Sequence, residues 1–302
     1  MTIHKSTLRN WLFAALIISV AVIALFGIYA RRCVQTTVPS ASPENKPQRI
    51  VSLAPDVTEI LFELGLGDSV IAVSNDCDWP PQALEKKKVG SFWQPSLEAV
   101  IACQPDLVIT LWFEQQSRVA ESLERMGYKV VTLRLEKLGE LAPAIDKIGE
   151  ATGHGDRARQ LIGDINRQLE RTKQKFAGGV RSRVLWVVQP DPLRVAGSNT
   201  FITELLELAG AQNALSDTDV QYPGLSSEEV LTCGADVIIQ AAMNKGTIER
   251  QRQEAIEFWS KYENLPAVKN NRIYVIDADT ILRLGPRIPQ GLEQIGQIIH
   301  QP

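Results

Sequence analysis

Hydrophobic residues recur along this chain at two spacings, which alternate from residue 49 onward. Short apolar runs rich in β-branched residues predict strands: RIVSL, VIAVS, DLVITL and KVVTLR in the first half, and RVLWVV, DVIIQA and RIYVID in the second. Between them, apolar residues at helical spacing predict helices, among them DVTEILFELGLGD, SLEAVIACQP and TFITELLELAGA. Strands that alternate with helices are typical of α/β layers, so we expect an α/β fold.

Two stretches of sixteen residues, 130 positions apart, carry the same pattern. PSLEAVIACQPDLVIT (95–110) and LSSEEVLTCGADVIIQ (225–240) are identical at six positions: Ser96/Ser226, Glu98/Glu228, Val100/Val230, Cys103/Cys233, Asp106/Asp236 and Ile109/Ile239. A second pair of helices shares a Thr-Glu opening, at residues 58–59 and 203–204, and a closing glycine. Because any two strand–helix units look alike, one match would mean little. Two matches in the same order favour internal duplication, and therefore two similar α/β lobes.

A long amphipathic helix is predicted between the two halves. Gly153-His154-Gly155 breaks the preceding helical pattern, and a helix is expected from near Asp156 to near Phe176, before Gly178-Gly179. Some 21 helical residues span about 30 Å, the width of a small domain. We therefore expect a stiff strut, within a connecting segment 138–179 that joins an N-terminal lobe, 49–137, to a C-terminal lobe, 180–302.

The N-terminal region reads differently from the rest. Residues 11–30 contain no charge and are long enough to cross a bilayer as a helix, whereas the apolar core of a cleavable signal peptide is shorter. Arg31 and Arg32 before Cys33 do not match a lipoprotein signal. We expect residues 1–33 to be a membrane anchor, with a cleaved signal segment as the alternative, and residues 34–48 to be a flexible tether.

Composition excludes several functions. A net charge of −3 gives no basic face for nucleic acid, and three histidines with no CxxC argue against a metal centre or a redox dithiol. The chain lacks a GxSxG nucleophile elbow and a dinucleotide fingerprint, so an α/β enzyme with an unrecognised site is the less favoured alternative. Cys103 and Cys233 are expected to be small buried residues, while Cys77 is either a loop thiol or a ligand-facing one.

Three longer blocks resemble a known family. RIVSLAPDVTEILFELGLGDSVIAVSNDCDWPPQA, KVGSFWQPSLEAVIACQPDLVIT and GLSSEEVL…ADVII closely resemble the substrate-binding proteins of ABC importers for cobalamin, haem and iron siderophores, from about residue 49 to the C-terminus. The resemblance implies two α/β lobes joined by one long helix, with the ligand in the cleft between them. DWPP and DADTILRLGPRI are most similar to the cobalamin-binding branch.

The function implied by this resemblance is capture of a cobalamin-like corrinoid on the periplasmic side of the bacterial inner membrane and delivery to an ABC permease with its ATPase. The corrinoid would be cargo rather than a cofactor, and no cofactor is expected. Haem or a ferric siderophore is the alternative ligand. Anchoring through residues 11–30 is expected, and free periplasmic protein is the alternative if this segment is cleaved.

Candidate ligand contacts lie in loops that follow predicted strands, where open α/β sheets bind ligands. The candidate aromatic residues are Trp79, Phe92, Trp93, Trp112 and Tyr222. Loop aromatics can equally cap a core, but several such loops together favour binding. Asp279 and Arg283 match a family pair that faces the polar edge of the ligand, and their spacing also suits a simple helical ion pair. Arg194 stands where the family often has an aromatic, and an extra arginine would suit ligand carboxylates.

The repeated glutamates also acquire a role from the resemblance. One surface glutamate on each lobe pairs with permease arginines in this family, and the matching residues are Glu98 and Glu228. A glutamate in the first turn of a helix is favoured by the helix dipole and needs no partner. Glu229 is the neighbouring alternative in the second lobe, although the 130-residue register selects Glu228.

Overall fold

The computed structural model describes residues 46–178, 181–242 and 248–301. The predicted anchor and nearly all of the tether lie outside the described residues. Among the helices of the described part, none is both long and apolar enough to cross a membrane.

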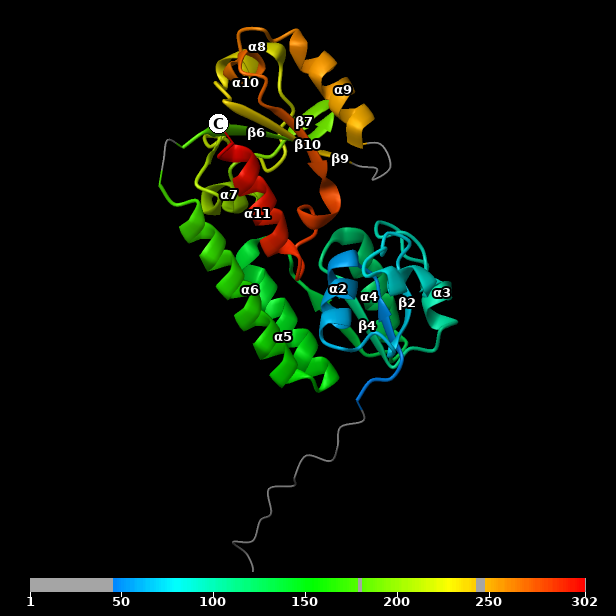
Figure 1. The fold of residues 1–302 in the computed structure, drawn as a ribbon. Helices are drawn as coiled ribbons and strands as arrows, with labels where there is room; N and C mark the ends of the chain where they lie inside the picture. The colour runs from blue at the N-terminus through cyan, green and yellow to red at the C-terminus, as the bar shows by residue number, and fades with distance from the viewer. Residues whose placement is uncertain (1–45, 179–180, 243–247, 302) are drawn as a thin grey trace, which may run out of the picture. The chain divides into compact units, whose positions relative to one another are not determined.

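The N-terminal lobe is built on a parallel sheet of five strands in the order β3-β2-β1-β4-β5 (Figure 1). The strands are β1 (Ile50–Ser52), β2 (Val70–Val73), β3 (Lys87–Lys88), β4 (Leu107–Leu111) and β5 (Val130–Leu133). The helices are α2 (Pro55–Glu63), the 3₁₀ turn η1 (Pro81–Glu85), α3 (Leu97–Ile101) and α4 (Glu114–Arg125). Every residue of β4 is buried, as expected for a parallel strand covered on both faces.

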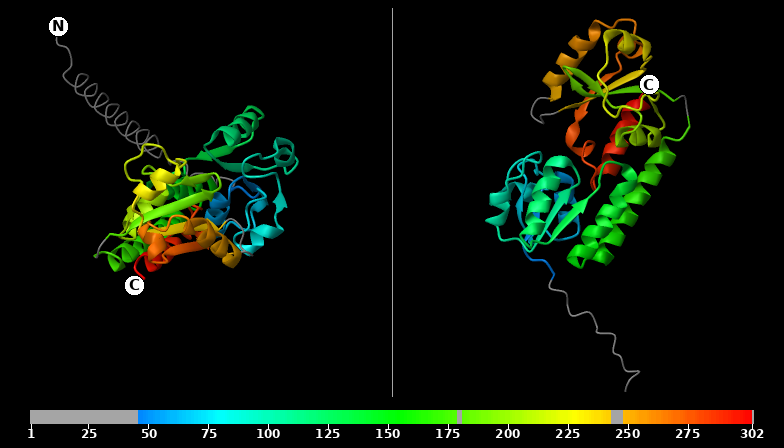
Figure 2. Two further views of the ribbon diagram at one scale, coloured as in Figure 1. Left: turned by 90° about the horizontal axis from the view of Figure 1, so that it is seen from above. Right: turned by 180° about the vertical axis from the view of Figure 1, so that it is seen from behind.

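Two helices connect the lobes. The 3₁₀ turn η2 (Leu138–Glu140) leads into α5 (Leu141–Thr152), and α6 (Gly155–Lys175) follows after Gly153, whose φ is 70°. The predicted long helix is confirmed, with 21 residues. Figures 1 and 2 show that α5 runs alongside α6, which the sequence analysis did not anticipate. The strut is therefore a helical hairpin rather than a single helix.

The C-terminal lobe has a second sheet, ordered β10-β9-β6-β7, in which β8 also pairs with β6. Its strands are β6 (Arg183–Pro190), β7 (Leu193–Val195), β8 (Gln212–Asn213), β9 (Val237–Ala242) and β10 (Ile273–Asp277). Its helical elements are α7 (Phe201–Leu208), α8 (Ser227–Thr232), α9 (Ile248–Ser260), α10 (Pro266–Lys269), the 3₁₀ turn η4 (Ala278–Thr280) and α11 (Ile288–Ile299). β7 is antiparallel to β6, whereas the other pairings are parallel.

The duplication extends to individual hydrogen bonds. At the start of β1, the Arg49 amide donates to the Asp106 carboxylate at 3.1 Å, and at the start of β6 the Arg183 amide donates to Asp236 at 2.8 Å. Each arginine side chain also donates to the carbonyl of the repeated cysteine, Cys103 or Cys233. The same local structure is therefore built twice.

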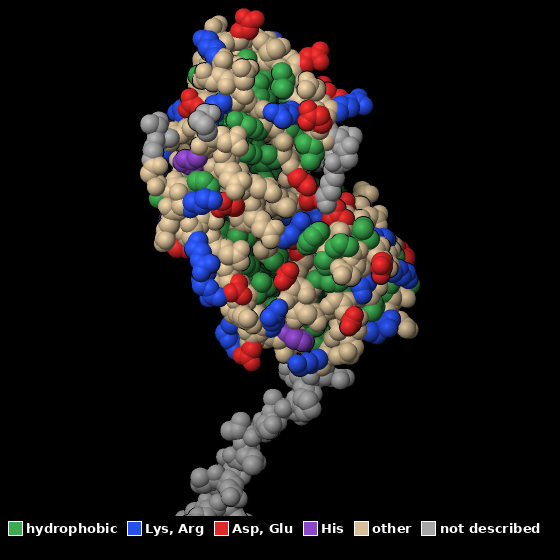
Figure 3. Space-filling model, in the orientation of Figure 1, with side chains coloured by type: hydrophobic (Ala, Val, Ile, Leu, Met, Phe, Trp, Pro, Cys, Tyr) green, Lys and Arg blue, Asp and Glu red, His purple; other side chains and the backbone are tan. Residues whose placement is uncertain are grey.

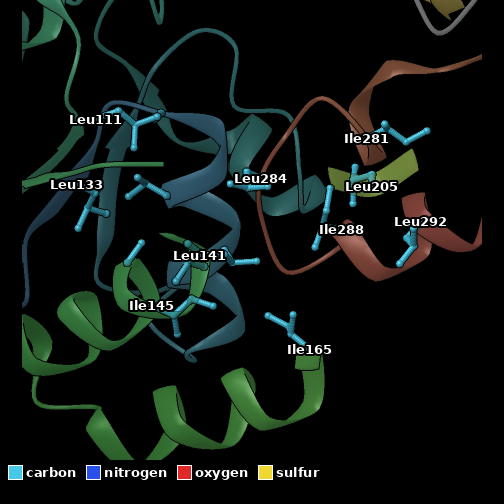
Figure 4. Packing of buried hydrophobic residues seen from close by; sticks show 14 of the residues in the cluster. Leu111, Leu133, Leu141, Ile145, Ile165, Leu205, Ile281, Leu284, Ile288 and Leu292 are labelled. Atoms are coloured by element: carbon cyan, nitrogen blue, oxygen red, sulfur yellow. The ribbon is translucent and has the colours of Figure 1, made fainter. Parts of the chain in front are cut away.

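One buried apolar cluster spans both lobes and the hairpin. Figure 4 shows its members reaching from Leu111 and Leu133 in the first sheet, through Ile145 and Ile165 of the hairpin, to the C-terminal lobe. Leu284, Ile288 and Leu292 in the C-terminal lobe belong to the same cluster. This shared cluster holds the lobes together, because separating them would expose buried apolar surface at a cost of about 25 cal/mol per Å².

Candidate ligand site between the lobes

Four of the five predicted aromatic contacts are the most exposed aromatics of the described chain. Trp93 is 63% exposed, Trp112 50%, and Trp79 and Tyr222 38% each. In Figure 3, hydrophobic side chains gather on the N-terminal lobe above α2 and α4. Large aromatics left in water on loops after strands are typical of a binding surface rather than of core caps.

Two of the predicted contacts, Phe92 and Trp93, form one group with Phe113. The Phe92 ring is half-buried and lies 5.0 Å from the Trp93 ring and 4.9 Å from the Phe113 ring, centroid to centroid. Trp112 lies against a different partner, the Arg134 guanidinium, 4.2 Å from its ring centre. The structure therefore brings Phe92 and Trp93 together and gives Trp112 a separate cation–π contact.

A buried glutamine fixes this aromatic loop, and the sequence analysis missed it. Gln116 in α4 is fully buried, and its amide nitrogen donates to the carbonyls of Leu53 and Phe92, each at 2.9 Å. Its amide oxygen accepts from the Leu111 amide at 2.9 Å and from the Thr110 hydroxyl. Both N–H groups and the oxygen of the amide are therefore hydrogen-bonded, as buried polar groups require. No local signal distinguishes this glutamine from its exposed neighbour Gln115.

Arg283 reaches from the C-terminal lobe to the N-terminal lobe. Its terminal nitrogens lie 2.5 Å from the Asp78 carboxylate and 3.4 Å from the Asp279 carboxylate, and one donates to the Asp76 carbonyl at 3.3 Å. The ion pair considered from the sequence is therefore present, but Arg283 lies in the loop between η4 and α11 rather than on a helix, and the pair is one part of a larger network. Burial alone would lower the pKa of Arg283. The nearby carboxylates of Asp78 and Asp279 outweigh this effect and raise the pKa above its ordinary value, so the side chain stays charged.

A second arginine crosses between the lobes a turn later. The Arg287 side chain donates twice to the carboxylate of Glu59, at 2.9 and 2.5 Å, and Glu59 is only 2% exposed. The same guanidinium lies 4.6 Å from the centre of the Trp79 ring. A bidentate pair combined with aromatic stacking is a contact that lysine could not reproduce. The pair thus links α2, the DWPP loop and the start of α11.

The repeated Thr-Glu motif explains where this contact comes from. In α7 the equivalent glutamate, Glu204, accepts from the Leu138 amide of the connecting segment at 2.7 Å. The side chains of Glu59 and Glu204 thus both bind a part of the chain outside their own lobe. The repeat is visible in the sequence, and its two matched glutamates were the available signal, but no role was predicted for them.

A cavity of about 320 Å³ opens beside the arginine network. We call it the interlobe cavity; it is lined by Pro55, Asp56, Asp76, Phe92, Asp279, Leu282 and Arg283. Burial, reinforced by the nearby Glu59 carboxylate, raises the pKa of Asp56 from 3.8 to about 7. Its Oδ1 atom is buried and accepts no hydrogen bond from any described residue. A carboxyl group held in this way favours its protonated form.

The surroundings of Cys77, Cys103 and Cys233 show that all three are buried. Cys77 is buried, and its sulfur lies 3.1 Å from the hydroxyls of Thr58 and Ser74, so it is an internal loop thiol rather than a ligand-facing one. Burial raises the pKa of the Cys77 thiol. Cys103 and Cys233 are confirmed as small buried residues, 5% and 6% exposed.

Arg194 lies on β7 and is exposed, with a terminal nitrogen 3.5 Å from the Tyr222 carbonyl. Its guanidinium belongs to the same loop region as Tyr222 but does not line the interlobe cavity.

The two repeated surface glutamates occupy equivalent places. Glu98 and Glu228 are exposed in the first turns of α3 and α8, which Ser96 and Ser226 cap through their hydroxyls. Glu229 completes a capping box with Ser226, whose amide donates to its carboxylate at 2.7 Å, and these hydrogen bonds lower the pKa of Glu229. Glu228 makes no side-chain hydrogen bond or ion pair to any described residue. The two neighbours therefore differ, since Glu229 is engaged and Glu228 is available.

Relatives cover most of this chain. It is 29% identical over 265 residues to the Bacillus subtilis protein named uncharacterized ABC transporter substrate-binding lipoprotein YvrC, a match that spans 85% of this chain and 81% of that protein. It is 28% identical over 250 residues to the vitamin B12-binding protein of Vibrio parahaemolyticus, across 82% of this chain and 88% of the relative.

Solved structures share the fold. A possible iron-binding periplasmic protein from Staphylococcus epidermidis superposes with a TM-score of 0.75 at 28% identity, over 85% of this chain and all of that one. The periplasmic vitamin B12-binding protein BtuF of Vibrio cholerae superposes with a TM-score of 0.73 at 27% identity, over 84% and 97% of the two chains. A periplasmic heme-binding protein from Pseudomonas aeruginosa gives 0.73 at 26% identity, over 84% and 93%.

A sequence profile described as periplasmic binding protein matches residues 50–280, which is most of the chain. The resemblance inferred from the sequence is thereby confirmed. With its two α/β lobes and helical connection, this chain belongs to the periplasmic binding protein family, a family of transport binding proteins rather than of enzymes.

Proposed function

We propose that this protein is the substrate-binding component of an ABC importer and that it captures a cobalamin-like corrinoid for delivery to the membrane permease and its ATPase. The observation that carries the proposal is the set of exposed aromatics, Trp79, Trp93, Trp112 and Tyr222, on loops that follow strands. A large, flat ligand requires such apolar area together with a few polar anchors. Relatives named as vitamin B12-binding proteins support the corrinoid assignment.

Two polar contacts would complete the ligand site. Asp279 and Arg283 are proposed to face the polar edge of the corrinoid, and Phe92 is proposed to support Trp93 beside it. The positions of both groups around the interlobe cavity support this arrangement.

Haem is the second candidate ligand. Exposed Arg194 supports it, because a guanidinium pairs well with a propionate carboxylate. Relatives with this fold are named for both ligands.

The ligand is tested by titrating the purified full chain, in mild detergent, with cyanocobalamin, haemin and a ferric siderophore while visible absorbance is recorded. We expect cyanocobalamin to bind with a Kd below about 10 μM, which corresponds to roughly 7 kcal/mol, and more tightly than the other two. Tighter binding of haemin would replace the corrinoid by the second candidate, and binding of none of the three would overturn the assignment.

We also propose a permease-docking role for Glu98 and Glu228, one on each lobe, and a membrane-anchoring role for residues 11–30. The availability of the Glu228 carboxylate, next to the engaged Glu229, supports the first. The second rests on the uncharged segment alone. The family of this chain supports our proposal that the lobes lie on the periplasmic side of the inner membrane. Intact mass of the exported protein tests the anchoring role, since a mature chain that begins after residue 30 would show cleavage instead.

A further inference from the structure

The interlobe cavity carries information about which ligand group it accepts. Three of its lining residues have carboxyl groups, Asp56, Asp76 and Asp279, and one has a guanidinium, Arg283. A single arginine in a ligand site ordinarily suggests an anionic ligand group. Here the groups that surround Arg283 argue against an anionic ligand group.

Arg283 is already engaged by the protein. Its Nη1 atom donates to the Asp78 carboxylate at 2.5 Å, and its Nη2 atom lies 3.3 Å from the Asp76 carbonyl and 3.4 Å from the Asp279 carboxylate. Its side chain is 15% exposed. A ligand carboxylate that approached this guanidinium would have to displace a protein carboxylate and would then meet that carboxylate at close range.

The remaining lining groups offer hydrogen-bond acceptors. Asp76 is exposed, and its Oδ2 atom accepts from the Phe92 amide at 2.5 Å, which fixes the carboxylate beside the aromatic loop. Asp56 lies at the start of α2, with one buried carboxyl oxygen that has no described partner. Its raised pKa keeps part of the population neutral near pH 7, so Asp56 can also donate through its own O–H.

We propose that the interlobe cavity takes an uncharged ligand group with N–H donors and a carbonyl acceptor, such as a primary amide, and rejects a carboxylate. This inference rests on the proposed function, and it names the chemical feature that would separate ligands of similar size. The periphery of a corrinoid carries primary amides, whereas haem carries carboxylates. Rejection arises because a carboxylate would be desolvated next to fixed carboxylates, with no uncommitted cation in the described lining.

A pair of ligands that differ by one group tests the proposal. Cyanocobalamin and its b-, d- and e-monocarboxylic acids, in each of which one peripheral amide is replaced by a carboxylate, are titrated into the full chain at pH 7.5. We expect at least one acid to bind about tenfold more weakly or worse, because like charges held together at an interface are strongly unfavourable. Equal affinity, within twofold, for cyanocobalamin and all three acids would overturn the proposal.

Two variants locate the effect. Asp76→Asn keeps an oxygen that can accept from the Phe92 amide but removes the charge, so we expect the ratio of affinities to fall below about threefold. Asp68→Asn, at an exposed aspartate outside the cavity, is the matched control and should leave the ratio unchanged. A ratio that does not fall in Asp76→Asn, or that falls equally in Asp68→Asn, would contradict the proposal.

Failure of the proposed function gives a different result. If cyanocobalamin does not bind, the corrinoid assignment falls, and the cavity is tested with haemin and its dimethyl ester. In the Arg194→Gln protein, which lacks the guanidinium proposed for a haem propionate, the cavity proposal then predicts tighter binding of the ester, whose propionates are neutral, than of haemin. Tighter binding of haemin by that variant would overturn the proposal independently of the ligand assignment.

Discussion

At the scale of single residues, Asp56 is the group whose chemistry departs furthest from its ordinary state. Its folded-state pKa of about 7 lies above the value of 3.8 in the unfolded chain, chiefly because the carboxyl is buried. The folded protein therefore holds a proton that the unfolded chain loses near pH 4. This contribution to stability is complete below about pH 4, falls as the pH rises to about 7, and is absent above it.

Asp56→Asn removes that dependence, since asparagine has the same shape and no charge. Relative to wild type, the variant should gain on the order of 2–3 kcal/mol of unfolding free energy between pH 5 and pH 8. Urea unfolding of both proteins at the two pH values measures the difference. Asp68→Asn, at an exposed carboxylate, is the control and should show no such gain. A wild-type and an Asp56→Asn curve that run parallel with pH would show that Asp56 is ionised in the folded protein.

At the scale of elements, α4 anchors the aromatic loop through Gln116. Gln116→Leu would leave buried groups of Leu53, Phe92 and Leu111 without partners, at about 1–3 kcal/mol for each unsatisfied group. We expect a loss of about 3 kcal/mol or more, together with faster hydrogen exchange at residues 91–93 than in β4. Gln115→Leu, at the exposed neighbour, should change stability by less than about 0.5 kcal/mol. Unchanged exchange in the loop of Gln116→Leu would show that other contacts hold it.

The helical hairpin offers two glycines for the same substitution with opposite outcomes. A Cβ at Gly163 in α6 would meet only the flexible end of Arg167, at 3.2 Å, so Gly163→Ala should stabilise by about 0.5–1 kcal/mol. A Cβ at Gly149 in α5 would lie 2.5 Å from Ala158 of α6, so Gly149→Ala should destabilise by about 1–3 kcal/mol. Thermal unfolding compares them, and a stabilising Gly149→Ala would contradict the close packing of α5 on α6.

Local patterns predicted the elements better than they predicted the partners of those elements. The glycine break and amphipathic spacing located α6, and the repeated Thr-Glu and closing glycines identified two lobes; Gly65 and Gly210 both adopt positive φ, 80° and 76°. The packing of α5 on α6 was not predicted, because each helix shows only its own apolar stripe. Arg287 and Glu59 are 228 residues apart, and no spacing rule connects them. Gln116 was missed because a glutamine in an amphipathic helix normally faces water.

At the scale of the whole molecule, the two matched glutamates are expected to act together at the permease. Glu98→Lys with Glu228→Lys should fold, bind ligand with unchanged affinity and fail to support uptake. Interface carboxylates that become desolvated cost about 2–5 kcal/mol when lost, whereas solvated helix-end carboxylates cost less than about 1. Ligand titration and an uptake assay in cells that lack the wild-type protein separate the two effects.

The control for docking reverses the charge of two other exposed glutamates, Glu121 on α4 and Glu257 on α9, again one per lobe. It should support normal uptake, because only position distinguishes it from the docking variant. Normal uptake by the Glu98→Lys, Glu228→Lys protein would reduce both residues to helix-dipole partners. Loss of its ligand binding would place them in the ligand site.

The proposed ligand binds at the aromatic loops next to the arginine network, and Trp79 joins the two through its stacking on Arg287. Calorimetric titration of cyanocobalamin into the wild-type full chain and into Trp79→Ala tests this most directly. We predict one ligand per chain with a Kd below about 10 μM for wild type, and binding at least about tenfold weaker for Trp79→Ala, because a stacked aromatic contact contributes well over 1 kcal/mol. Equal affinity of the two proteins, or no binding by wild type, would contradict the account.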